Sequence, residues 1–311
     1  MKVYVLHENP EWYAPLAAAF DQAGLPHEQW LLGEAVLDLA AAPPPGVFWS
    51  RMSASSHTRG HPFAKDQTRG VLAWLESFGC QVVNGRRVLD LEMSKVEQLT
   101  ALRAAGFDVP RTLAVAGRAE LTTAARTLPV PFIAKHNQGG KGLGVRRFDS
   151  HGEFESYVAG PDYEPPVDGI TLLQEYLVAA QPRITRAEIV GAEFRYAITA
   201  DTARGGFQLC PADACAIGTD GQPAAAEPSL FALRADFDHP VVARYVEFAA
   251  AHGIGIAGFE FIETVDGRLV TYDINTTTNY NAEIEAVAPR PALPAVAAYL
   301  GGLLDRTHAA A

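Results

Sequence analysis

The alternation of apolar and polar positions is clearest near the C-terminal end of the chain. Two runs rich in Phe, Ile, Val, Leu and Tyr flank Asp266-Gly267 within the stretch from Gly258 to Asn281. Asp-Gly between such runs is the strongest short-range signal for a hairpin with a two-residue turn. This turn would fix the register of both strands and give three facing pairs: Val265 with Arg268, Ile262 with Thr271, and Glu260 with Asp273.

Successive side chains of a strand point to opposite faces, so the predicted hairpin has one polar and one apolar face. The polar face is expected to carry Glu260, Ile262, Thr264, Thr271, Asp273 and Asn275. The apolar face, which we expect to join the core, carries Phe259, Phe261, Val265, Val270, Tyr272 and Ile274.

The polar face brings two carboxylates together. The Cβ atoms of Glu260 and Asp273 should lie about 4.5–5.5 Å apart, where like charges repel. Asn275 adds an amide oxygen, and Mg²⁺ binds carboxylate and amide oxygens together with waters and substrate phosphates. The face therefore predicts a metal site; the alternative is a solvated hairpin face with two ordinary acids.

The first ninety residues alternate between strand and helix patterns. Strands are predicted at 2–6, 47–49 and 81–83, and helices at 11–23 and 65–78. This order predicts a small parallel α/β domain. No glycine fingerprint follows the first strand, so a dinucleotide-binding unit is excluded.

A polar loop follows the second of these strands. Loops after the carboxyl ends of strands in an open α/β sheet are where ligands bind. The loop is a candidate substrate site; the alternative is a polar surface loop. Its candidate residues are Arg51, Ser53, Ser55, Ser56, His57 and Arg59.

Two lysines stand at the ends of predicted elements. Ser94 to Glu97 matches a capping box, which places Lys95 in the first turn of a helix that ends at Gly106. A cation there opposes the helix dipole, so it suits an anionic ligand held at the helix start. Lys135 ends a strand that begins at Phe132. The alternative for Lys95 is a flexible surface lysine.

A glycine-rich segment follows Lys135 directly. It contains Gly139, Gly140, Gly142 and Gly144 together with Lys141. Four glycines in six residues allow backbone N–H groups to close around phosphates, and the lysines add positive charge. The segment lacks the Gly-Lys-Ser/Thr of a Walker A loop and precedes a strand pattern, which predicts a loop covering a ligand between two strands. The alternative is a bare hairpin turn.

Composition narrows the function classes. The chain has 311 residues, a net charge of −11 and a pI of about 5.3, and no basic patch is evident, so nucleic acid is not an expected partner. Its three cysteines have no metal-binding spacing. No apolar run reaches membrane-spanning length, so we expect no membrane partner and a cytoplasmic protein.

The order of these features resembles the ATP-grasp superfamily. The order is a helix-start lysine, a strand-end lysine, the GGKGLG segment, the strand end Gln174-Glu175-Tyr176, a strand with Arg186, and the acidic hairpin. Within the superfamily the chain is most similar to the branch of the ribosomal-protein glutamate ligase. The resemblance extends from about Asn84 to about Glu285.

The resemblance implies an α/β and α+β architecture with two α+β subdomains clamping ATP. The expected division is an N-terminal α/β domain at 1–92 and an ATP-grasp domain at 93–311. Within the latter, the lid-bearing subdomain would cover about 93–172 and the metal-bearing subdomain about 173–311.

The resemblance also implies site roles. Lys95 and Lys135 would hold the ATP phosphates under the glycine-rich segment, and Arg186 would face an acyl phosphate, with Lys135 and Arg186 catalytic. Adenine would be read by the hinge residues Gln174, Glu175, Tyr176 and Leu177. One or two Mg²⁺ ions, replaceable by Mn²⁺, would bind Glu260, Asp273 and Asn275. Substrate would contact the polar loop together with Asn279 and Asn281.

The implied function is an ATP-dependent carboxylate–amine ligase that forms an amide or peptide bond through an acyl phosphate and releases ADP and phosphate. Its partners would be small-molecule or peptide carboxylates and amines, and a homo-oligomer stays open. The alternatives are a catalytically silent nucleotide-binding module and a kinase-like phosphotransferase. One departure is that Asp273 replaces the usual longer glutamate, which leaves the number of metals open.

Overall fold

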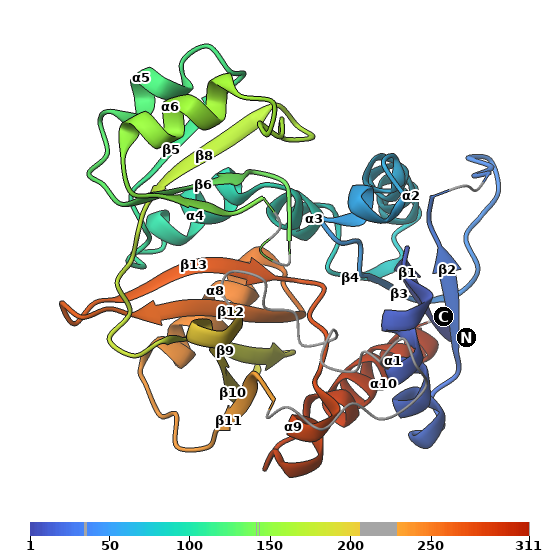
Figure 1. Ribbon diagram of the computed structural model, residues 1–311. Helices are drawn as coiled ribbons and strands as arrows, with labels where there is room; N and C mark the ends of the chain where they lie inside the picture. Colours follow the sequence, from blue (N-terminus) through green and yellow to red (C-terminus); the bar gives the residue numbers. More distant parts are fainter. Residues whose placement is uncertain (34–35, 141, 143, 206–228, 311) are drawn as a thin grey trace, which may run out of the picture.

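The computed structural model describes residues 1–33, 36–140, 142, 144–205 and 229–310. These residues form three β-sheets with helices packed against them (Figure 1). The mixture of parallel and antiparallel sheets confirms the predicted combination of α/β and α+β structure. The Gly-, Ala- and Pro-rich composition of residues 201–228 predicts an irregular segment. Residues 206–228, which include Cys210 and Cys215, lie outside the described residues, whereas Asp201 ends a strand and Thr202–Gly205 form a short helix, contrary to this prediction.

The first sheet is parallel, with the order β2-β1-β3-β4. Its strands are β1 (Lys2–His7), β2 (His27–Leu31), β3 (Gly46–Ser50) and β4 (Gln81–Val83). Its helical elements are α1 (Pro10–Gln22), η1 (Ser56–Arg59), α2 (Ala64–Ser77) and α3 (Arg86–Met93). The three predicted strands and two predicted helices are confirmed. The edge strand β2 was not predicted, because its sequence His-Glu-Gln-Trp-Leu is mostly polar and only partly buried.

The second sheet is antiparallel, with the order β5-β8-β6-β7. Its strands are β5 (Thr112–Ala116), β6 (Phe132–His136), β7 (Arg146–Phe148) and β8 (Ile170–Glu175). The helices α5 (Leu121–Ala125) and α6 (His151–Ala159) contribute Leu121 and Phe154 to the buried cluster on this sheet. The glycine-rich segment therefore connects two neighbouring antiparallel strands, as predicted.

The third sheet is also antiparallel, with the order β11-β10-β9-β12-β13. Its strands are β9 (Arg183–Val190), β10 (Glu193–Asp201), β11 (Phe231–Arg234), β12 (Ile256–Glu263) and β13 (Leu269–Asn275). The helix α7 (Thr202–Gly205) follows β10, and α8 (Val241–His252) packs on the apolar face of the sheet. The helix α4 (Lys95–Ala104) lies between the second and third sheets, against β13 (Figure 1).

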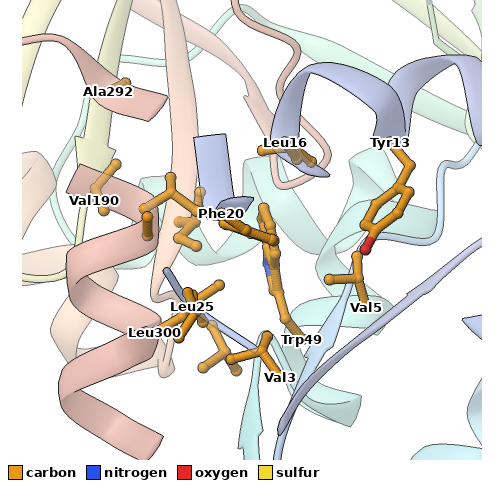
Figure 2. Close-up of a cluster of buried hydrophobic side chains, with 14 of the residues drawn as sticks. Val3, Val5, Tyr13, Leu16, Phe20, Leu25, Trp49, Val190, Ala292 and Leu300 are labelled. Atoms are coloured by element: carbon orange, nitrogen blue, oxygen red, sulfur yellow. The ribbon is translucent and has the colours of Figure 1, made fainter. Parts of the chain in front are cut away.

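The C-terminal helices join the first and third sheets. Pro289, Pro291 and Pro294 predict a broken helix over residues 282–304, and the structure has two helices there, α9 (Ala282–Val287) and α10 (Ala292–Ala310). Figure 2 shows Val3 and Trp49 from the first sheet in one cluster with Val190 of β9 and Leu300 of α10. This shared core fixes the first sheet beside the third, and the predicted domain boundaries at 92 and 172 remain predictions.

The acidic hairpin is built differently from its prediction. Val265 to Gly267 form a three-residue loop, in which the Gly267 N–H donates to the Thr264 carbonyl and Gly267 has φ of 84°. The loop shifts the register by one residue, so Thr271 pairs with Phe261 rather than with Ile262. A bulge that follows shifts it back, and Glu260 pairs with Asp273 as predicted.

Because of the bulge, two side chains of the hairpin face the opposite side from the one predicted. Tyr272 was expected in the core, but its hydroxyl donates to Glu260 Oε2 at 2.8 Å on the acidic face. Thr271 was expected on the acidic face, but it is buried and bonded to the Tyr245 hydroxyl at 2.6 Å. Val265 was expected in the core, yet its place in the loop leaves it 65% exposed.

Candidate functional site

A cavity of about 680 Å³ lies where the three sheets meet. It brings together most of the residues selected from the sequence, although they are up to 226 positions apart along the chain (Ser53 and Asn279). The predicted residues that line it are Ser53, Ser55, Lys95, Lys135, Gly139, Gly140, Gly142, Gln174, Glu175, Tyr176, Leu177, Arg186, Glu260, Asp273, Asn275 and Asn279.

The acidic face of the hairpin forms one wall of this cavity. Burial and the neighbouring Asp273 carboxylate raise the pKa of Glu260. The Asn275 amide oxygen accepts from the Thr277 N–H at 2.9 Å, so the turn after β13 holds it in place. In the described part of the chain no three His, Cys, Asp or Glu side chains are arranged around a metal position. Two carboxylates and an amide fit Mg²⁺, which leaves further positions to phosphate oxygens and water.

Two lysines oppose these acids. Lys95 Nζ lies 2.5 Å from Asp273 Oδ1. Burial lowers the pKa of Lys95, but the attraction of Asp273 outweighs it and the net shift is upward. Lys135 is buried and has no hydrogen-bond or ion-pair partner among the described residues. Burial, and then the nearby Lys95 charge, lower the pKa of Lys135 to about 8.

The start of α4 is occupied by protein groups. The Val96 N–H donates to Asn137 Oδ1 at 2.8 Å, and the Glu97 N–H donates to Ser94 Oγ at 3.3 Å. The predicted N-cap is therefore confirmed. Because these amides already have partners, the Lys95 side chain rather than the helix backbone is the group that can bind an anion here.

Arg186 lines the cavity and is held in place by two hydrogen bonds. Its Nε donates to Glu188 Oε1 at 2.6 Å and its Nη2 to the Asn279 carbonyl at 3.1 Å. Burial lowers the pKa of Arg186, but Glu188 and Glu260 outweigh this and raise it, so the guanidinium stays charged. Gly258 on β12 leaves the space that the Arg186 side chain fills, because a Cβ there would lie 2.8 Å from Arg186 Cδ.

The predicted hinge residues line the cavity at the end of β8. Glu175 Oε1 accepts from the Arg111 N–H at 2.9 Å, and Gln174 Nε2 donates to Thr112 Oγ1 at 2.8 Å. Both side chains therefore fix the strand end in place. Tyr176 and Leu177 follow directly and also line the cavity.

Several predicted substrate residues lie behind the cavity wall instead of on it. Arg51 is buried and donates to the Thr278 carbonyl at 2.8 Å and to Asn279 Oδ1 at 3.1 Å, which holds the loop after β13. Asn281 caps α9. The remaining residues that do not line the cavity are Ser56, His57, Arg59 and Gly144, and Lys141 lies outside the described residues.

The sequence reasoning missed several cavity residues, and three of them bear on the chemistry of the site. Glu92 on α3 is buried, and burial raises its pKa. Trp12 comes from α1, and Tyr272 reaches the cavity through the bulge. A lone acid and two aromatic residues in apolar patterns carry no local signal for a binding site. The packing of α1 and α3 places Trp12 and Glu92 there, and the bulge places Tyr272.

Sequence comparison finds no protein-family model and no curated protein that matches the chain. Solved structures do match. A RimK domain protein from Sphaerobacter thermophilus, an ATP-grasp protein, gives a TM-score of 0.63 at 18% identity, covering 96% of this chain and 99% of its own. The D-cycloserine synthetase DcsG gives 0.65 at 16% identity, covering 97% and 99%.

A third similar structure is the ATP-grasp ligase PsnB complexed with minimal precursor, Mg and ADP. It gives a TM-score of 0.62 at 14% identity, covering 99% of this chain and 96% of its own. None of the helices in the described ranges is long and apolar enough to cross a membrane. Near-complete coverage in both directions, together with the three-sheet arrangement around one cavity, confirms the predicted fold: the chain has the ATP-grasp fold and resembles the RimK branch.

Proposed function

We propose that the protein is an ATP-dependent ligase that joins a carboxylate to an amine through an acyl phosphate. One observation carries the proposal. Four residues line the same cavity: the buried Lys135, which has no partner among the described residues, the acid pair Glu260 and Asp273, and Arg186. A cation that burial makes costly, with no partner of its own, is what an anionic ligand would stabilise.

The nucleotide would span the cavity from the hinge to the acids. Tyr176 and Leu177 would contact the adenine, and Lys95 and Lys135 the phosphates, beside Gly139, Gly140 and Gly142. Glu260, Asp273 and Asn275 would hold Mg²⁺, with Mn²⁺ able to replace it. The metal would neutralise phosphate charge when bound. The PsnB structure, which holds Mg and ADP, supports this pairing of fold and ligands.

The chemistry would proceed in two substitutions. A carboxylate oxygen attacks the γ-phosphorus, the bond from that phosphorus to the ADP oxygen breaks, and ADP leaves. The amine nitrogen then attacks the acyl carbon, the carbon–oxygen bond to phosphate breaks, and phosphate leaves while the nitrogen loses a proton. Lys135 reduces the repulsion of the first step, and Arg186 offers two donors to the charge that develops on the acyl phosphate.

The substrates would enter from the side of Ser53, Ser55 and Asn279, opposite the hinge. A small molecule or a peptide could supply the carboxylate or the amine, and the comparisons support both classes, since DcsG is a D-cycloserine synthetase and PsnB holds a minimal precursor. We expect the reaction to take place in the cytoplasm, where ATP is supplied, and a homo-oligomer stays open.

The direct test uses ATP, Mg²⁺, pools of carboxylates and hydroxylamine as a small nucleophile. Formation of ADP together with a hydroxamate is the expected result, and Asp273→Ala should abolish it. AMP and pyrophosphate would contradict the acyl-phosphate route. A stable phosphoester would indicate the kinase-like alternative, and ATP that binds without turnover in all pools would indicate a silent nucleotide-binding module.

A further inference from the structure

The backbone N–H and carbonyl of Ala54, which belong to two successive peptide groups, are each bonded to a side chain from another part of the fold. Its N–H donates to Glu92 Oε1 at 3.3 Å, and its carbonyl accepts from Gln138 Nε2 at 3.2 Å. Ala54, Glu92 and Gln138 are all buried. Ala54 lies between Ser53 and Ser55, two cavity residues of the loop that follows β3.

The Gln138 side leads to the glycine-rich segment. Gln138 immediately precedes Gly139 and Gly140, and Lys65 Nζ donates to Gln138 Oε1 at 2.7 Å, which fixes the amide orientation. A Cβ on Gly140 would lie 3.5 Å from Ser55 Oγ, so the backbone of this segment is in close contact with the Ser53–Ser55 turn.

The Glu92 side leads to the metal face. Glu92 Oε2 accepts from the Thr276 N–H at 2.9 Å and from its hydroxyl at 2.8 Å. Thr277 in turn donates its N–H to Asn275 Oδ1 at 2.9 Å. A continuous set of hydrogen bonds therefore runs from Gln138 through Ala54 and Glu92 to the turn that holds Asn275.

We propose that Gln138 and Glu92 are positioning residues that couple occupancy of the nucleotide site to the Ser53–Ser55 substrate segment through the backbone N–H and carbonyl of Ala54. The inference rests on the proposed function, since it takes the glycine-rich segment and Asn275 as nucleotide and metal contacts. Ordering those two contacts would restrict the motion of Gln138 and Glu92, whose side chains bond to the carbonyl and the N–H of Ala54. Nucleotide binding then prepares the substrate segment, and substrate binding strengthens nucleotide binding by the same factor.

The coupling would let the acyl phosphate form only when the Ser53–Ser55 segment is ordered to hold the substrate. With the Ser53–Ser55 segment out of place, γ-phosphoryl transfer would go to water instead of to the substrate carboxylate. Loss of the hydrogen bonds from Gln138 and Glu92 to Ala54 should therefore raise the amount of ADP formed for each hydroxamate formed. A simple loss of folded protein does not change this ratio.

The experiment measures amide hydrogen exchange with and without Mg²⁺ and AMP-PNP. In the unmodified protein the ligand should slow exchange in residues 53–56 by about 5-fold or more, the low end of measured couplings between sites. In Gln138→Met that slowing should disappear, while slowing at the start of α4 and at the hinge 174–177 persists. Lys65→Met frees the Gln138 amide without removing it, so it should reduce the slowing only in part.

Arg126→Gln is the matched control. Arg126 is an exposed residue at the end of α5, and its Nη2 lies 2.7 Å from Glu155 Oε1. This substitution should leave the ligand-induced slowing of exchange unchanged in every segment. Equal slowing at 53–56 in Gln138→Met and the unmodified protein would overturn the coupling while leaving the proposed function standing. No slowing anywhere in the unmodified protein would overturn both.

Discussion

Lys95 Nζ lies 2.5 Å from Asp273 Oδ1, which places a predicted phosphate ligand directly on a predicted metal ligand. In the structure the Lys95 ammonium is paired with the Asp273 carboxylate oxygen that a divalent cation would otherwise bind. Phosphate binding would draw Lys95 away and release that oxygen. Nucleotide and metal should therefore bind cooperatively, each strengthening the other.

Replacing Lys95 separates the two effects. Lys95→Met should tighten Mn²⁺ binding to the nucleotide-free protein, because Glu260 and Asp273 lose the competing ammonium. The same change should weaken nucleotide binding by about 10-fold or more, as expected for loss of a charged hydrogen bond. Titrations followed by Mn²⁺ electron paramagnetic resonance and by calorimetry with ADP measure both. Weaker metal binding in the variant would contradict competition at Asp273.

The pKa of Lys135, lowered to about 8 by burial, predicts a pH dependence of nucleotide binding. Below pH 8 the side chain is already protonated and the Kd for ADP should not depend on this group. Above pH 8 binding requires uptake of one proton, so the Kd should rise about tenfold for each pH unit. Lys135→Arg, which stays charged, should bind ADP without this rise. A flat profile in the unmodified protein would refute the assignment.

The same group should cost the folded protein stability. Its pKa falls from an ordinary value of 10.5 to about 8 on folding, so the unfolded chain binds more protons between those values. Stability should therefore rise with pH across that range, and the cost of about 3 kcal/mol is fully present below pH 8. Lys135→Met should stabilise the nucleotide-free protein at pH 7 by up to this amount. Urea unfolding measures it, with the exposed Lys2→Met as a control expected within about 0.5 kcal/mol.

Gly258 should be intolerant of any side chain. A Cβ at this position would lie 2.8 Å from Arg186 Cδ, so Gly258→Ala must displace Arg186 from Glu188 and Asn279. Turnover should fall about 100-fold, comparable to losing one donor to a developing charge, with nucleotide affinity little changed. Gly70→Ala, on an exposed position of α2 with open space around it, should keep full activity and gain up to about 1 kcal/mol of stability. Unchanged turnover in Gly258→Ala would show that Arg186 has room to adjust.

Tyr272 should strengthen the acidic face through its 2.8 Å hydrogen bond to Glu260. Burial already raises the pKa of Glu260, and losing a donor in Tyr272→Phe would raise it further. Mg²⁺ affinity in the presence of ADP should fall about 10-fold at pH 6 and less at pH 8, because protons compete with the metal for the carboxylate. Equal loss at both pH values would indicate a steric effect instead.

Local sequence determined the elements whose signals are themselves local. Ser94 predicted the start of α4 because a cap needs only its own helix, and the alternation around Asp266-Gly267 predicted a hairpin because turn and strands are contiguous. The pairing of Glu260 with Asp273 was also predicted, although the loop is one residue longer than expected and a bulge restores the register. The order of lysines, glycines and acids was sufficient to predict the fold.

Tertiary structure alone decided how these elements meet. Arg51 and Ser53 are two residues apart in one polar loop, yet packing against the loop after β13 places Arg51 behind the wall and Ser53 on it. Glu92 has no local motif and becomes central because α3 brings it to Ala54 and Thr276. Burial, charge partners and hydrogen-bond geometry depend on residues far apart in the chain. The sequence therefore determined which chemical groups are present, and only the packing of the three sheets decided which of them share a cavity.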